Sequence, residues 1–217
     1  MSTPTESPAT PAVADPAPLG LAAFALTTFL LSVVNAHWAT SSSGLAWLGY
    51  GLAYGGLVQL LAGMWEFKNK NVFGATAFSS YGGFWIGLYF YIHVVVTGGL
   101  VHSPLQVHRD LGWILLAFAI FNTYMLIIST QLNTAVFGVF LTLELTEIFL
   151  FIGNFTINAG QVANGDTNTM LKIGGIIGVI TALVAWYTSA AIVVNTMRGG
   201  APTLWVGKAL WPARQSV

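Results

Sequence analysis

The sequence predicts an all-α integral membrane protein: six transmembrane helices arranged as three hairpins around a pore, with the N and C termini in the cytoplasm. Two observations lead to this fold class. Only 6% of the residues are charged and 55% are hydrophobic, which leaves too little polar surface for a soluble domain of this size. Apolar runs also recur, each long enough to cross a bilayer core of about 30 Å. We therefore expect a multi-pass protein of the cytoplasmic (plasma) membrane, in contact with the lipid bilayer.

The chain divides into three segments. Residues 1–14 are mostly Ser, Thr, Pro and Ala without a periodic apolar pattern, so we predict a disordered N-terminal tail. Residues 15–196 hold the six predicted helices. Residues 197–217 form a cytoplasmic tail, with Trp205 and Trp211 placed to lie at the membrane interface. The absence of cysteine excludes a disulfide framework, and the net charge of zero gives no indication of a nucleic-acid partner.

The first predicted helix spans residues 19–37 and follows Pro16 and Pro18, which disfavour helix before it. No Lys or Arg precedes this run and similar runs follow, so we do not expect a signal peptide. The polar turn 40–43 leads to a second helix over residues 44–65, which predicts a tight antiparallel hairpin. The other predicted helices span residues 76–97, 111–129, 134–157 and 171–194.

The loops between these spans carry nearly all of the charge. Six spans place both termini on one side of the membrane, together with Lys68, Lys70, Arg198, Lys208 and Arg214, and leave Arg109 and Lys172 on the other. Because Lys and Arg accumulate in cytoplasmic loops, this bias predicts cytoplasmic termini. Glu66 ends the second predicted helix close to two of these lysines, which predicts an ion pair at the interface.

Glycines four residues apart recur in three helices, where they let helix backbones approach closely in lipid. The pairs are Gly51 with Gly55, Gly83 with Gly87, and Gly174 with Gly178. They predict packing of helices within one subunit or, alternatively, a contact between subunits.

A weak internal repeat relates the first, third and fifth helices. In each, a bulky residue is followed by further residues three, four and eleven positions later. The sets are Phe24, Thr27, Thr28 and Asn35; Tyr81, Phe84, Trp85 and Ile92; and Leu143, Thr146, Glu147 and Asn154. Because eleven residues make almost three turns, each set lies on one helix face. The repeat therefore predicts three hairpins around one axis.

Two blocks resemble a known family. Pro-Ala-Pro-Leu-Gly-Leu at residues 16–21 is similar to the signature that opens the first helix of the acetate uptake transporter family (acetate/succinate–proton transporters, GPR1/FUN34/YaaH). That signature normally begins with Asn, where this chain has Asp15. Residues 73–85 look like the second strong block of the family, and the resemblance spreads over most of residues 15–195.

The resemblance implies a function and an architecture. Members of the family transport acetate, and perform no enzymatic reaction that would need a cofactor. Their apolar constriction is formed by Phe, Tyr and Leu, which match Phe24, Tyr81 and Leu143 here, the last by counting back from Ile152-Gly153-Asn154. The resemblance also implies a homo-hexamer with one pathway per subunit.

The chemistry of such a path follows from the cost of moving charge. A monocarboxylic acid has a pKa of about 4 in water, so it is mostly anionic at neutral pH, and its bare anion would incur a large desolvation penalty between apolar side chains. We hypothesise that the acid crosses with a proton. Thr28, Asn35 and Asn154 would hydrogen-bond its carboxyl group, with help from the Tyr81 hydroxyl.

Two carboxylates lie within the otherwise apolar fifth helix, and a carboxylate within a membrane helix is a functional candidate. Glu147 lies about 40° from Leu143 around the helix and Glu144 about 100°, so Glu147 is the candidate for proton relay. The alternative is a hydrogen-bonded packing residue, and the resemblance assigns neither carboxylate a role. We expect no metal site, because no pair of His37, His93, His102 and His108 has the spacing of a helical metal site.

Three functions stay open at this point. The first is uptake of acetate, or of succinate and other small carboxylates, by proton symport. The second is a passive channel for acetate or for small neutral solutes such as ammonia or urea. The third is a membrane sensor that binds acid without net transport. Proton-driven accumulation would indicate the symporter, flux that only equilibrates would indicate the channel, and binding without flux would indicate the sensor.

Overall fold

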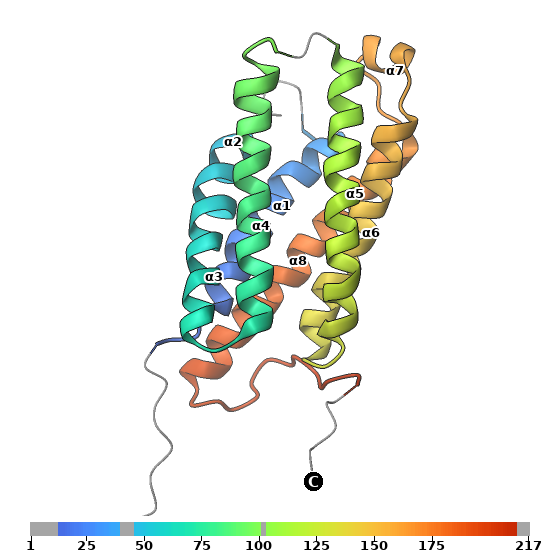
Figure 1. The fold of residues 1–217 in the computed structure, drawn as a ribbon. Coiled ribbons are helices and arrows are strands. Elements are labelled where there is room, and N and C mark those ends of the chain that lie inside the picture. The colour runs from blue at the N-terminus through green and yellow to red at the C-terminus, as the bar shows by residue number, and fades with distance from the viewer. Residues whose placement is uncertain (1–12, 40–45, 101–102, 212–217) are drawn as a thin grey trace, which may run out of the picture.

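The computed structural model describes residues 13–39, 46–100 and 103–211, and these form a bundle of helices with no β-strand among them (Figure 1). The all-α prediction is thereby confirmed. Within these described residues, four helices are long and apolar enough to cross a membrane: α1 (Ala17–Asn35), α5 (Pro104–Ser129), α6 (Thr134–Thr156) and α8 (Thr169–Met197). Most of the predicted tail 1–14, the turn 40–43, His102 and Arg214 lie outside the described residues.

The second and third predicted spans are not continuous α-helices. The second consists of α2 (Ala46–Tyr50), the π-helical segment η1 (Gly51–Val58) and α3 (Gln59–Lys68); the third consists of α4 (Val72–Phe90) and the π-helical segment η2 (Tyr91–Val96). Within η1, a Cβ on Gly55 would lie 2.5 Å from the Thr27 hydroxyl oxygen of α1. Glycine at this position therefore lets η1 pack directly on α1.

Asparagine side chains fix where several helices begin. Asn71, Asn133, Asn158 and Asn168 precede α4, α6, the short α7 (Ala159–Ala163) and α8, and each accepts a hydrogen bond from a backbone N–H three residues later. Sequence reasoning missed α7 and began the third helix at residue 76, four residues later than α4. It also began the fourth helix at residue 111, whereas α5 begins at Pro104 and includes His108 and Arg109, which were expected in a loop.

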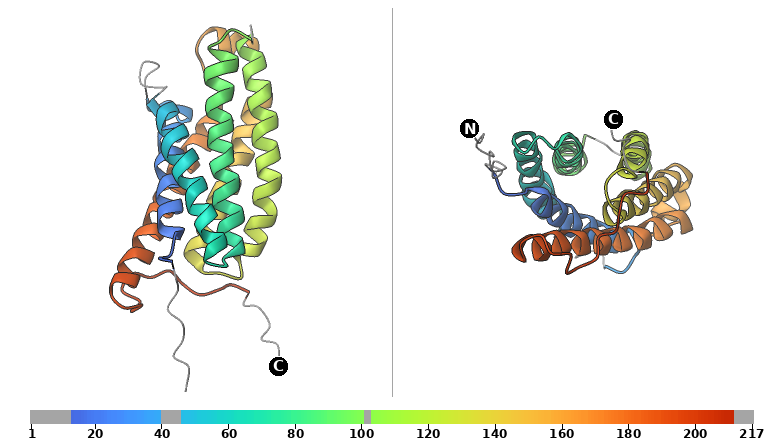
Figure 2. Two further views of the ribbon diagram at one scale, coloured as in Figure 1. Left: turned by 60° about the vertical axis from the view of Figure 1, so that its left-hand side comes forward. Right: turned by 90° about the horizontal axis from the view of Figure 1, so that it is seen from below.

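Successive spans alternate in direction, with α2, η1 and α3 forming one span and α4 and η2 another, so that the described chain begins and ends at the same end of the bundle (Figure 1). We call this the terminal end, and the end that holds α7 the distal end. Seen along the bundle, the helices surround a common axis (Figure 2). The main packed pairs are α1 with α8, α3 with α4, α5 with α6, and α6 with α8. The first helix thus packs most extensively against the last, as well as against its neighbours η1 and α3.

The glycine pairs differ in what they contact. Gly174 lies against Leu150 of α6, and Gly178 lies between Ser32 of α1 and Thr146 of α6. Gly83 and Gly87 instead face open space, with no described atom within 4 Å of an added Cβ. Packing within one subunit therefore accounts for the pair in α8, while the pair in α4 lies on an uncovered face.

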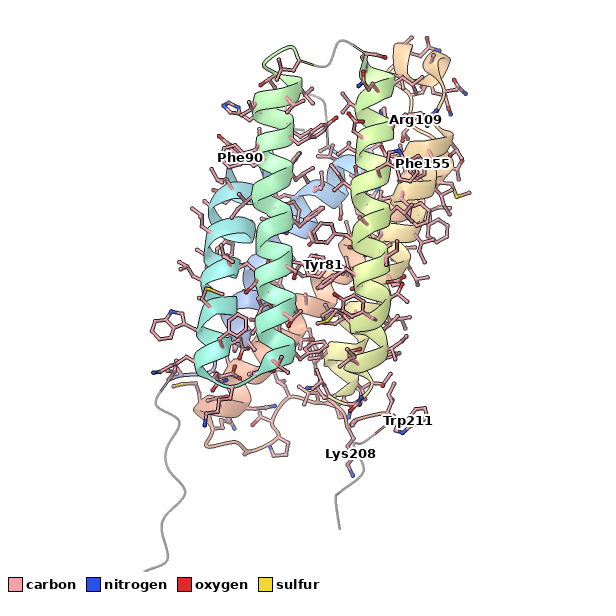
Figure 3. The ribbon with its side chains drawn as sticks, viewed as in Figure 1. Tyr81, Phe90, Arg109, Phe155, Lys208 and Trp211 are labelled. Carbon is pink, nitrogen blue, oxygen red and sulfur yellow. The ribbon has the colours of Figure 1, made fainter. Side chains whose placement is uncertain are left out.

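The residues after α8 return across the terminal end (Figure 3). The backbone N–H of Ala135 at the start of α6 donates to Val206 O at 2.9 Å, and the N–H of Trp211 donates to Thr130 O at 2.9 Å. The Asn195 side chain accepts from Leu204 N at 2.8 Å. This C-terminal segment therefore ties the end of α8 to the α5–α6 turn.

Candidate functional site

Three cavities follow one another along the axis of the bundle. The central cavity has a volume of about 50 Å³, a few times the roughly 10–15 Å³ that one water needs. It is lined by faces of α1, α4, α5 and α6, and its lining residues include Phe24, Thr28, Asn35, Tyr81, Phe84, Trp85, Leu143, Thr146 and Glu147. The cavity therefore has room for a few waters or one small solute.

The distal cavity, of about 120 Å³, adjoins the central one on the side of α7. The walls of both cavities contain Leu31, Asn35, Phe84, Leu115 and Leu150. The distal cavity also reaches His108 and Asn154, where His108 Nδ1 lies 2.7 Å from Asn154 Oδ1. Since an amide oxygen only accepts, this contact requires that His108 Nδ1 carries the proton.

The terminal cavity, of about 170 Å³, lies at the opposite end and shares no lining residue with the central cavity. Between the two lies an apolar cluster that we call the constriction cluster. It contains Phe24, Tyr81 and Leu143 from the central wall, and Leu21, Phe78 and Phe140 from the terminal wall. The Phe24 and Tyr81 rings meet edge to face, with centroids 5.7 Å apart.

Tyr81 is the polar member of this cluster and lies at mid-height of the bundle, between α4 and α5 (Figure 3). Its hydroxyl lies 3.0 Å from Asn122 Oδ1 and 3.3 Å from Glu147 Oε1. The Asn122 amide donates to Glu144 Oε2 at 2.7 Å and to Phe140 O at 3.0 Å. A hydroxyl has one proton, so when it bonds to Asn122, a protonated Glu147 donates to the Tyr81 oxygen.

Three residues that line the central cavity each have a buried polar atom without a hydrogen-bond partner among the described residues: Thr28 Oγ1, Trp85 Nε1 and Glu147 Oε2. They come from α1, α4 and α6 respectively. A buried polar group left unpaired costs about 1–3 kcal/mol. The cavity therefore offers a donor, a hydroxyl and a carboxyl oxygen to a polar solute, while its other walls are mainly apolar.

Arg109 anchors the distal end of α6. Its guanidinium donates to the carbonyl oxygens of Asn154, Phe155 and Ile157, which are the otherwise unpaired carbonyls at the end of a helix. Arg109 and Phe155 lie side by side between α5 and α6 (Figure 3). The contact holds Asn154 at the wall of the distal cavity.

The sequence profile of the GPR1/FUN34/yaaH family matches residues 2–199, nearly the whole chain. The chain belongs to this family. Acetate permease A of Emericella nidulans is 40% identical over 195 residues, which cover 84% of this chain and 62% of that protein. Ammonia transport outward protein 2 of Saccharomyces cerevisiae is 39% identical over 191 residues, with 82% and 61% covered. The chain thus spans about three fifths of the length of these fungal relatives.

Two bacterial comparisons cover family members of similar length. The succinate-acetate/proton symporter SatP of Escherichia coli K12 is 34% identical over 187 residues, which cover 86% of this chain and 92% of SatP. The solved structure of the bacterial acetate channel SatP matches with a TM-score of 0.77 and 33% identity, over 90% of this chain and 99% of that one. Together with the four apolar spans, these relatives identify this family member as a multi-pass membrane protein.

The position of a repeat residue within its set determines which cavity it lines. In all three sets, the first residue and the residue four positions later line the central cavity: Phe24 and Thr28, Tyr81 and Trp85, and Leu143 and Glu147. The last residues, Asn35, Ile92 and Asn154, line the distal cavity. Of the residues three positions after the first, Phe84 and Thr146 also line the central cavity. Thr27 does not, because its hydroxyl bonds Ala23 O within α1 and its side chain packs on Gly55.

Sequence reasoning missed several residues of these cavities. Trp85 belonged to the repeat but was not considered a donor, and His108 of the distal cavity comes from α5, which carries no copy of the repeat. Asn122, also of α5, lines none of the three cavities but bonds Tyr81. The interfacial ion pair predicted for Glu66 is wrong: the side chain is 0% exposed, and Oε2 accepts from Asn69 Nδ2 at 3.3 Å. Glu66 lines the terminal cavity, while Lys68 and Lys70 are exposed.

Proposed function

We propose that this family member carries acetate together with a proton across the membrane, along the axis that joins the three cavities. The observation that carries the proposal is the set of three unpartnered polar atoms in the central cavity, on Thr28, Trp85 and Glu147. Relatives named as an acetate permease, a succinate-acetate/proton symporter and an acetate channel support the same class of solute.

The three atoms match the two ends of a carboxyl group. The carbonyl oxygen of acetic acid accepts from the Trp85 indole N–H and from the Thr28 hydroxyl. The O–H of the acid donates to Glu147 Oε2. Its methyl group then lies against Phe24 and Leu143, which line the same cavity. The pairing satisfies groups whose burial is otherwise unfavourable.

The constriction cluster explains why acetate must cross together with a proton. A carboxylate entering the cluster would leave its hydrogen bonds in the central cavity and find mainly aromatic and aliphatic side chains. Such desolvation costs an ion far more than it costs a neutral carboxylic acid. The acid therefore crosses the cluster in its neutral form. Passage requires a movement of side chains, because Phe24 and Tyr81 are in contact.

The size of the central cavity predicts which acids are transported faster. A central cavity of about 50 Å³ favours acetate, and succinate has a second carboxyl group that must also be neutralised, so we expect succinate to cross more slowly. The uncovered Gly83 and Gly87 provide a face on which a second copy can pack closely, which supports a homo-oligomer, with six subunits by family resemblance. The basic residues of the terminal end favour cytoplasmic termini.

A passive acetate channel is the second candidate, and the structural match to a protein described as an acetate channel favours it. The two candidates differ in the charge that they move. A 1:1 symport of acetate and a proton moves no net charge, whereas a channel for the anion does.

Radiolabelled acetate uptake into proteoliposomes separates them. Acetic acid also crosses lipid unaided, so rates are measured against protein-free liposomes. For the symporter, an inward proton gradient raises the protein-dependent initial rate, while a potassium–valinomycin potential at equal pH leaves it unchanged. Uptake that follows the potential would indicate the channel. Acetate binding without any protein-dependent flux would contradict both transport functions and indicate a sensor.

A further inference from the structure

The terminal cavity has a carboxyl group that the proposed path does not yet use. Glu66, in the last turn of α3, is fully buried and lines this cavity. Its Oε2 has only a long hydrogen bond, 3.3 Å from Asn69 Nδ2, and its Oε1 has no partner among the described residues. An acidic oxygen that is buried, unpaired and in a cavity wall is available to a solute.

Two helix N-termini face the same cavity. Asn71 caps α4 and Asn133 caps α6, and both side chains line the cavity together with Gly74 and Val136 of the first turns. α4 has 19 residues and α6 has 23, so each presents the partial positive charge of a full helix. The cavity therefore combines an acidic group with an environment that stabilises an anion.

The charged groups around Glu66 leave its carboxyl without a counter-ion. On its own side of the bundle, Lys68 and Lys70 are exposed. Ahead of α1, the exposed Asp15 accepts from Ala17 N at 2.9 Å and adds negative charge near Glu66. The other elements in the cavity wall, α4, α6 and α8, contribute no charged side chain to its lining.

Gly74 keeps the space beside this carboxyl open. A Cβ at Gly74 would lie 2.6 Å from Glu66 Oε1 and 2.7 Å from Asn71 Nδ2, closer than real Cβ contacts allow. The absence of a side chain at residue 74 is therefore needed for the position of the Glu66 carboxyl. Any Cβ there displaces either the carboxyl group or the cap of α4.

We propose that Glu66 is the proton-exchange group of the terminal cavity, which takes the proton from a carboxylic acid that has crossed the constriction cluster and returns it in the reverse direction. This inference rests on the proposed function. In the forward step the O–H bond of the acid breaks and an O–H bond forms at Glu66 Oε1. The acid leaves as a carboxylate that the α4 and α6 N-termini stabilise, and Glu66 then releases the proton to water.

One carboxyl group then stands on each side of the constriction cluster. Glu147 accompanies the acid in the central cavity, and Glu66 accompanies it in the terminal cavity. A proton that crosses with its acid has an acceptor on each side of the constriction cluster, so no isolated ion has to enter the cluster.

The test compares the parent with Glu66→Gln and Glu66→Asp in proteoliposomes. The rate of acetate exchange is measured with the same pH on both sides, over a range of pH, so that the orientation of the protein does not matter. Acetate binding is measured with radiolabelled acetate on the protein in detergent, and thermal unfolding in the same detergent verifies folding. Gln keeps the shape of the side chain but cannot titrate, whereas Asp keeps the titration.

We expect Glu66→Gln to lower the exchange rate by about tenfold or more and to flatten its pH profile, with binding and stability unchanged. Glu66→Asp should recover a pH profile with a displaced midpoint. An unaltered pH profile in Glu66→Gln would overturn the inference, and so would a loss of binding and stability shared by Gln and Asp, which would indicate a packing role. A parent without protein-dependent flux would instead overturn the proposed function, and this inference with it.

Discussion

The central and terminal cavities lie on opposite sides of the constriction cluster and present their polar groups differently. In the central cavity, Thr28, Trp85 and Glu147 each have an atom without a partner. In the terminal cavity, the amide oxygens of Asn71 and Asn133 are already bonded to the first turns of α4 and α6. Among the described side chains that line it, Glu66 is the one with a buried oxygen that has no partner.

The two cavities therefore illustrate two roles of buried polar side chains, one in stability and one in solute binding. An amide that caps a helix stabilises the bundle whether or not a solute is present. A group without a partner is unfavourable until a solute supplies one. Substitutions in the central cavity should therefore change transport more than stability, and substitutions of the terminal caps should do the reverse.

The largest effect is expected for Glu147→Gln. If Glu147 accompanies the proton of the acid, the variant loses proton-driven acetate uptake by about a hundredfold or more, within the range for positioned acid–base groups. Uptake into proteoliposomes with an inward proton gradient measures it. Glu144→Gln is the matched control, because Glu144 bonds Asn122 and Thr123 outside the cavity. Unchanged coupling in Glu147→Gln would remove this residue from the mechanism.

Phe24→Ala should alter selectivity. Removing the ring that meets Tyr81 widens the constriction, so propionate uptake should rise by about tenfold relative to acetate, since the one extra methylene is worth roughly 1–3 kcal/mol in an apolar site. Competition between the two labelled acids gives the ratio, and size-exclusion chromatography identifies folded protein. A ratio equal to that of the parent would place the selective contact elsewhere.

Trp85→Phe tests the indole N–H as a donor to acetate in the central cavity. The loss of one hydrogen bond of about 1 kcal/mol should raise the half-saturation concentration for acetate by about fivefold, with little change in thermal stability because the Trp85 N–H has no protein partner. Trp113→Phe on the exposed face of α5 is the control and should leave uptake unchanged. Equal effects of the two substitutions would contradict the assignment of Trp85.

Asn133→Ala should have the smallest effect on transport. The variant loses the cap of α6, which costs about 1 kcal/mol of stability, while the half-saturation concentration for acetate changes by less than about twofold. Thermal unfolding in detergent measures the loss of stability, and uptake kinetics measure the half-saturation concentration. A large loss of affinity with unchanged stability would mean that the terminal cavity also holds its solute through the caps.

Much of the site is encoded locally. Positions three, four and eleven residues apart share a helix face whatever the neighbours are, so the repeat could place Phe24, Tyr81 and Leu143 on one side of their helices before any packing was known. The structure adds that the residues four positions after the first line the central cavity and those eleven positions after it line the distal cavity, with Asn35 lining both.

The rest depended on contacts between distant segments. Trp85 is unpaired only because of the groups packed around it, and Asn122 matters only because α5 brings it to Tyr81. Glu66 looked interfacial because two lysines follow it, whereas α4 and the start of α1 enclose it. The π-helical η1 and η2 also had no sequence signal, since their residues form an apolar run like any other span.

The packing of α1 against α8 has a consequence for how the protein is made. About 130 residues separate the end of α1 from the start of α8, yet Ser189 of α8 donates to Pro18 O at 2.7 Å, and the backbone of Gly175 fits directly against residues 35 and 36. At roughly 5–20 residues per second of synthesis, the first helix waits on the order of 10 s for its main partner. During this interval the face of α1 that carries Ser32, which packs against Gly178 of α8, remains without that partner, so assembly of the bundle can be completed only when the last helix has left the ribosome.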